Sequence, residues 1–153
     1  MFRRRSRTSP IPRYSAAGWI WRIVVAVVAF PVAYYTFGAM VAPIVVPYYE
    51  GGGPLGLVIP PQTVMLRTVL VRSSIFLVAS LPAVLLWIGS RRGPIGAMGL
   101  AHAVLVGIFA MAQASHLMPP ILRITHSIEI TADSFAYAAV LVWLFVHRSP
   151  RRG

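Results

Sequence analysis

The sequence predicts an all-α integral membrane protein, in which four transmembrane helices form a compact antiparallel bundle with both termini in the cytoplasm. Its composition, its long uncharged stretches and the placement of its arginines lead to this prediction. Hydrophobic residues make up 58% of the 153 residues and charged residues only 11%, which leaves too little polar surface for a water-soluble domain. From Ser73 to Ile88 the chain carries no charged residue at all.

Four stretches come close to the ~20 apolar residues that cross a hydrocarbon layer of ~30 Å. These predicted spans cover residues 18–46, 64–89, 95–114 and 129–147. Basic tails, residues 1–17 and 148–153, flank this four-helix domain. The first span also resembles a secretory signal, but its apolar run from Ile23 to Val46 is longer than the ~7 to 15 residues of a signal core. We therefore expect it to remain as a transmembrane helix, with Pro31 introducing a kink.

The arginines predict the orientation of the helices. The net charge of +11 comes from arginine alone, and the main clusters lie before the first span, at Arg91 and Arg92, and after the fourth span. These clusters fall on one side of the bilayer, which the positive-inside rule identifies as cytoplasmic. Tryptophans favour the membrane boundary, and all of them lie at the same ends of the spans: Trp19, Trp21, Trp87 and Trp143. Tyr48 and Tyr49 mark the opposite boundary.

The connection between the first two spans, residues 47–62, has a distinctive composition. It contains three consecutive glycines, Gly51 to Gly53, followed by the apolar segment Leu55 to Ile59. A glycine-rich phosphate loop needs a preceding strand, a following helix and usually a lysine, which this sequence lacks. We expect a tight turn whose apolar segment lies on the membrane surface or dips into it.

A stripe of small residues marks one face of the third span. Gly99, Ala103 and Gly107 recur every four residues, so a neighbouring backbone can approach closely at this face. We expect the face to be buried against another helix, either in this bundle or in another membrane protein.

The polar residues most able to form a site lie on the fourth span. His126, Glu129 and Asp133 share one helical face, and Tyr137 extends that face by another turn. Two carboxylates one turn apart repel each other, so either one is protonated or a cation lies between them.

Arg72 on the second span is the predicted partner. Its depth matches that of Glu129, and its long side chain could also reach Asp133. Arg67 is rotated by roughly 140° from Arg72, so we expect it to extend to the lipid headgroups instead. The cluster is interpreted either as an ion pair that fixes helix register or as a transport or binding site.

His102 lies near the middle of the bilayer, where an ionisable group is a functional candidate. It could equally be a neutral histidine hydrogen-bonded to a tyrosine, such as Tyr34, Tyr35 or Tyr137. A haem with two histidine ligands needs a second histidine at this depth, whereas the others lie nearer the surfaces: His116, His126 and His147. The pair His126 and Glu129 has a spacing compatible with zinc but is not specific for it. No cofactor and no metal are therefore predicted, and the chain has no cysteine.

No motif of a serine hydrolase and no HExxH sequence occurs, so no enzymatic activity is predicted. The favoured function is that of a non-enzymatic accessory or scaffold component, associated with another membrane protein or with copies of itself in the bilayer, and not with nucleic acid. One alternative is a proton-coupled or small-solute transporter that uses the polar cluster. A second is a haem-binding or metal-binding membrane protein. The exclusive use of arginine and the simple topology favour the inner membrane of a bacterium.

Overall fold

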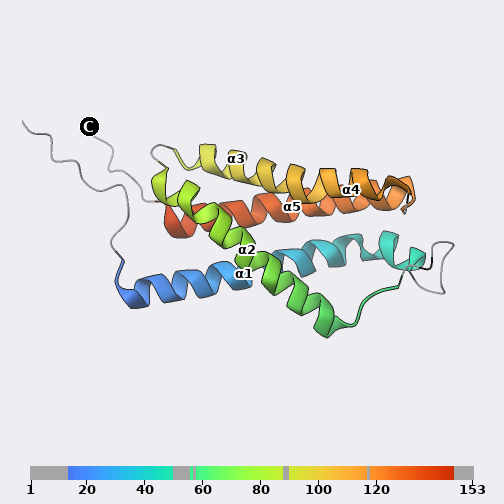
Figure 1. The fold of residues 1–153 in the computed structure, drawn as a ribbon, viewed down its shortest axis with the longest axis horizontal. Helices are drawn as coiled ribbons and strands as arrows, with labels where there is room; N and C mark the ends of the chain where they lie inside the picture. Colours follow the sequence, from blue (N-terminus) through green and yellow to red (C-terminus); the bar gives the residue numbers. More distant parts are fainter. Residues whose placement is uncertain (1–13, 50–55, 57, 88–89, 117, 147–153) are drawn as a thin grey trace, which may run out of the picture.

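The computed structural model describes residues 14–49, 56, 58–87, 90–116 and 118–146. This part of the chain is all-helical and contains four helices that are long and apolar enough to cross a membrane, which confirms that part of the predicted fold (Figure 1). Most of both basic tails, the three glycines of the first connection and His147 lie outside the described residues.

The helices alternate in direction along the long axis of the molecule (Figure 1). Helix α1 (Ala16–Val45) runs into a 3₁₀ turn, η1 (Val46–Tyr48), and α2 (Gln62–Leu86) returns. The third rod comprises α3 (Arg92–His102), a π-helical segment η2 (Ala103–Ile108) and α4 (Phe109–Gln113), and it ends in a 3₁₀ turn, η3 (Ala114–His116). Helix α5 (Pro120–Phe145) completes the fold. We call the end where α1 begins and α5 ends the proximal end, and the opposite end the distal end.

Helix α5 is the centre of the arrangement. It packs along α1 on one side and along α3, η2 and α4 on the other, whereas α2 crosses the others obliquely and packs mainly on α1 (Figure 1). In the most apolar stretch of α5, half of the residues are buried inside the protein, whereas in that of α1 only 17% are buried. The expected compact antiparallel bundle is therefore three rods side by side with an oblique fourth.

The fourth helix begins well before the predicted position, at Pro120 instead of residue 129. The apolar pattern of the sequence begins late because Arg123, His126 and Glu129 lower the hydropathy of the first turns of the helix. Proline is favoured in the first turn of a helix, where its missing N–H has no partner to lose. The polar residues are then carried on a regular helix that continues to Phe145.

The outward faces of the helices are apolar. Large hydrophobic side chains such as Ile20, Val78 and Leu105 are more than half exposed, whereas Asp133 and Ser73 are buried. This distribution is the reverse of that in a water-soluble protein and is the one expected when the surrounding medium is hydrocarbon.

Two arginines close the proximal end of α5. Arg22 Nε donates a hydrogen bond to the carbonyl oxygen of Leu144 at 3.0 Å, and Arg91 Nη2 donates one to that of Val146 at 3.0 Å. The last carbonyls of a helix have no partner within the helix, so these guanidinium groups satisfy them and complement the negative end of the helix dipole.

The small-residue face of the third rod packs within the chain, against α5. A Cβ placed on Gly99 would meet the Phe135 ring at 2.6 Å, and one placed on Gly107 would meet Ile130 at 2.9 Å. Ala103 between them is 1% exposed. These glycines therefore set the distance between the third rod and α5.

Replacing Gly99 by leucine should destabilise the fold by about 1 to 3 kcal/mol, because the added side chain must displace the Phe135 ring. Gly96 in the same helix offers a matched control, since a Cβ there meets no atom within 4 Å. Thermal unfolding in mild detergent would compare Gly99→Leu with Gly96→Leu. Equal stabilities for the two variants would contradict the packing described here.

Candidate functional site

Two buried carboxylates on α5 form the centre of the candidate site. Glu129 is 6% exposed and lies in the distal half of the helix, whereas Asp133 is 1% exposed and lies at its middle. Their spacing of four residues puts them on one helical face, one turn apart. Buried acids require compensating partners, because an unpaired charge in an apolar interior is costly.

Glu129 is bonded to a histidine of its own helix. His126 Nδ1 lies 2.9 Å from Glu129 Oε2, and His126 Nε2 lies 3.3 Å from the hydroxyl oxygen of Tyr49, just after η1. Burial, followed by the negative charge of Glu129, raises the pKa of the Tyr49 phenol, so its hydroxyl keeps its proton and can donate to Nε2. A carboxylate accepts hydrogen bonds, so Nδ1 of His126 is the donor in its bond to Glu129. A line of hydrogen bonds thus leads from the distal end to Glu129.

The predicted pairing of Arg72 with Glu129 is not formed. Among the described residues, the only basic side chain at ion-pair distance from a carboxylate is His126, next to Glu129. Arg72 is half-buried and lies within electrostatic range of Asp133 and of the Tyr34 hydroxyl. Matching residues by depth assumes parallel helices, whereas α2 crosses the others obliquely (Figure 1).

Asp133 is satisfied mainly by its neighbour in sequence. The Ser134 hydroxyl donates to Asp133 Oδ1 at 3.4 Å, a long and weak hydrogen bond. Glu129 acts on Asp133 as a repelling charge and Arg72 as an attracting one. The carboxylates and Arg72 therefore form one electrostatic group across α2 and α5.

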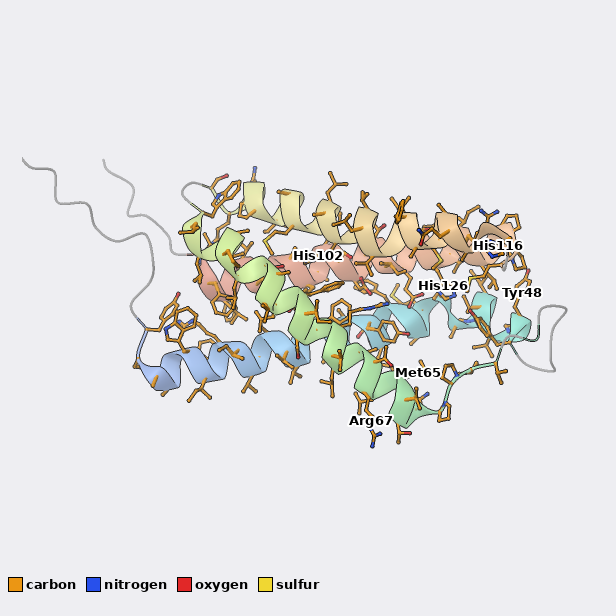
Figure 2. All side chains as sticks on the ribbon, in the orientation of Figure 1. Tyr48, Met65, Arg67, His102, His116 and His126 are labelled. Atoms are coloured by element: carbon orange, nitrogen blue, oxygen red, sulfur yellow. The ribbon has the colours of Figure 1, made fainter. Side chains whose placement is uncertain are left out.

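Glu129 and His126 border a cavity of about 370 Å³ between α1, the start of α2 and α5, which we call the distal pocket. Its walls are aromatic and apolar, with Tyr34, Tyr35 and Tyr49 on the α1 side and Met65 on the α2 side. Figure 2 shows His126 and Met65 on the elements that border this part of the molecule. Ligand sites in proteins are commonly cavities of roughly 300 to 1,000 Å³ with apolar walls and a few polar groups.

Gly38 on α1 brings the two helices together at the pocket. A Cβ on this residue would lie 3.2 Å from Glu129 Oε1, so the missing side chain makes room for the carboxylate. Gly38 also lines the pocket itself. A buried acid facing an aromatic cavity can attract a cation or donate a hydrogen bond when protonated.

His102 lies apart from this cluster, toward the proximal end (Figure 2). Its Nε2 is 3.1 Å from the hydroxyl oxygen of Ser80, and its ring stacks on Phe76 at 4.6 Å with an interplanar angle of 9°. The predicted tyrosine hydrogen bond is therefore wrong, since a serine on α2 takes that place and Tyr137 contributes only a ring contact at 6.2 Å. Within the described residues, Nδ1 of His102 is buried and has no hydrogen-bond partner.

Tyr137 belongs to the core rather than to the pocket. It is fully buried, and its hydroxyl donates to the carbonyl oxygen of Ser73 at 3.4 Å. Its ring packs edge-on against Phe30 at 5.3 Å. The bond to Ser73 links α5 to α2.

Metal and haem sites find no geometric support in the described part of the chain. There, no three histidine or carboxylate side chains come together as a metal ion would require. His116 and His126 lie near the distal end, away from His102 (Figure 2).

Four residues that border the pocket are not predicted to do so from the sequence. Tyr34 and Tyr35 are predicted only as possible partners of His102, Tyr49 is predicted only as a boundary residue, and Gly38 has no predicted role. A glycine inside an apolar helix is a usable signal, because it marks a place where another group comes close. The contact of Tyr49 with His126 depends on how the chain turns after α1 and has no local signature.

Comparisons of this chain with known protein families, with curated proteins and with solved structures give no match.

Removing the imidazole should leave Glu129 buried without its hydrogen-bond partner. We expect His126→Ala to destabilise the protein by about 1 to 3 kcal/mol, and clearly less when Glu129 is already glutamine, because a neutral amide costs less to leave unpaired. Thermal unfolding in detergent of the two single variants and the double variant measures this coupling. His116→Ala, at an exposed distal histidine, is the control and should be neutral. A double-mutant cycle without coupling would contradict the bond.

Proposed function

We propose that this chain is a multi-pass protein of a bacterial inner membrane, with the proximal end and both termini in the cytoplasm. The exposed apolar faces of the helices and the arginines at the proximal end support this location. The tryptophans lie at the same end, and Trp21, Trp87 and Trp143 are substantially exposed, as boundary residues would be.

We further propose that the protein binds a small organic cation in the distal pocket and exchanges it for a proton, as in proton-coupled transport of a small solute. The observation that carries this proposal is the buried carboxylate of Glu129 at the wall of an aromatic cavity. No activity on a covalent bond is proposed.

The pocket walls favour a positively charged ligand. The Tyr34 and Tyr35 rings lie edge to face with centroids 5.4 Å apart, and both border the cavity. Aromatic faces attract ammonium groups, and a carboxylate adds a direct charge-assisted contact. Arg72 supplies one positive charge against the negative charges of Glu129 and Asp133, so the site can accept one more.

The spacing of the acids supports coupling to protons. Carboxylates one turn apart in a buried site are stable together only if a cation or a proton compensates the second charge. When an organic cation enters, it can supply that compensation, and one proton then leaves a carboxyl group for water. When the cation leaves, a proton returns.

The accessory or scaffold role stays a prediction. The small-residue face that favoured it is covered by α5, so such a role would use a different surface.

A transport function would require copies of the chain to associate, because four helices with an oblique second helix can hardly enclose a pathway alone.

Alkaline phosphatase fusions test the proposed orientation. A fusion after Pro60 should be active, because this connection would lie outside the cytoplasm, and a fusion after Ser90 should be inactive. Fluorescent-protein fusions at the same positions should give the opposite pattern, which controls for expression. Phosphatase activity from the Ser90 fusion would overturn the topology.

Titration calorimetry in nanodiscs tests cation binding with probes of matched shape. We expect benzylammonium or tetraethylammonium to bind at pH 7 with release of a proton, and neutral benzyl alcohol to bind much more weakly. Glu129→Gln should weaken cation binding at least tenfold, about 1.4 kcal/mol, because it removes the charge. Arg67→Gln, which alters an exposed residue of α2 outside the pocket, should leave binding unchanged. If neither cation binds, or if Glu129→Gln binds as the unaltered protein does, the proposal fails.

A further inference from the structure

A second hollow lies on a different face of α5. It is a groove of about 780 Å³ between α5 and the η2–α4 part of the third rod. Its walls are mostly apolar and include Ile108, Met111, Ala112, Ile128 and Phe135. The side chains of Ile108 and Ile128 are half exposed or more, so the groove opens to the surroundings of the helices.

A single cation lies at the distal end of this groove. Arg123, in the first turn of α5, lines it together with Ser127 and Thr131, which follow at intervals of one helical turn. Nε of Arg123 is buried and has no hydrogen-bond partner within the described residues, and no carboxylate there forms an ion pair with this guanidinium. The described part of the chain therefore leaves this partly buried positive charge uncompensated.

The length of the groove suits one leaflet of a bilayer. From Arg123 to Phe135 the helix rises by roughly 18 Å, at ~1.5 Å per residue. Half of a hydrocarbon layer of ~30 Å is about 15 Å. A ligand with an anionic head at Arg123 could thus extend an acyl chain along the whole apolar wall.

We propose that this groove is a binding site for one anionic phospholipid, with its phosphate on Arg123 and an acyl chain between α4 and α5. A second copy of the chain is a poor occupant, because it has only three acidic residues and two of them, Glu129 and Asp133, are buried. A phospholipid supplies both the negative head and the apolar tail. The inference rests on the proposed membrane location but not on cation binding in the distal pocket.

Native mass spectrometry of the full chain, purified in mild detergent and supplied with defined lipids, tests the site. We expect one phosphatidylglycerol molecule to be retained by the unaltered protein and by Arg67→Gln, and retention to fall at least fivefold in Arg123→Gln. Arg67 is the matched control, because it is the other clearly distal arginine on a helix and points away from the remaining helices (Figure 2). Ala112→Trp, which narrows the apolar wall without changing charge, should also reduce retention.

Comparing different added ligands distinguishes binding of an anionic lipid from binding of phosphate alone. Phosphatidylglycerol should raise the unfolding temperature of the unaltered protein more than phosphatidylcholine or inorganic phosphate does. Equal retention by Arg123→Gln and Arg67→Gln, or an equal effect of phosphate alone, would overturn the lipid site. Cation binding by Arg123→Gln in the same preparation would show that such a failure concerns the groove and not the distal pocket.

Discussion

The burial of two carboxylates on α5 is the constraint on which the distal half of this structure depends. Glu129 and Asp133 are almost inaccessible, so each neighbouring element must provide compensation or space. Helix α5 itself provides His126, α1 provides the gap at Gly38, and α2 brings the charge of Arg72 within range. The same arrangement leaves a cavity beside the acids, so packing and the proposed function share one cause.

The helix with the lowest hydropathy is also the most buried. The most apolar stretch of α5 has a mean hydropathy of 1.5, and 50% of it is buried. The corresponding stretch of α2 has a mean hydropathy of 2.1, and 33% of it is buried. In water the relation would be reversed. In hydrocarbon, polar side chains are stabilised only by other parts of the protein, so the helix that carries them becomes the centre of the fold. Arg22 and Arg91 complete this centre by binding the carbonyls at its proximal end.

The sequence predicts the helices well, because length and hydropathy are local properties. It also predicts that the face of Gly99 and Gly107 packs on another helix, but it does not predict which polar side chains meet across helices. The shared face of His126 and Glu129 follows from their spacing, and the structure brings them into contact. Arg72 was assigned to Glu129 by counting residues along parallel rods, and the oblique course of α2 defeats such counting. The serine partner of His102 was not predictable either, because a hydroxyl on another helix leaves no periodic signal.

Helix α5 separates charges of opposite sign by rotation about its axis. The acids face α1 and α2, whereas Arg123 lies with Ser127 and Thr131 on a face turned by roughly 130° toward α4. Any negative charge of the two acids that His126 and Arg72 leave unbalanced can be balanced by a proton or a cation that enters the protein. An arginine at the edge of an open groove can be balanced by what surrounds the protein, and in a membrane that is a lipid phosphate. Under the two proposals, one helix with two polar faces binds a solute on its inner side and a lipid on its outer side. A movement of α5 would then change the shape of both sites.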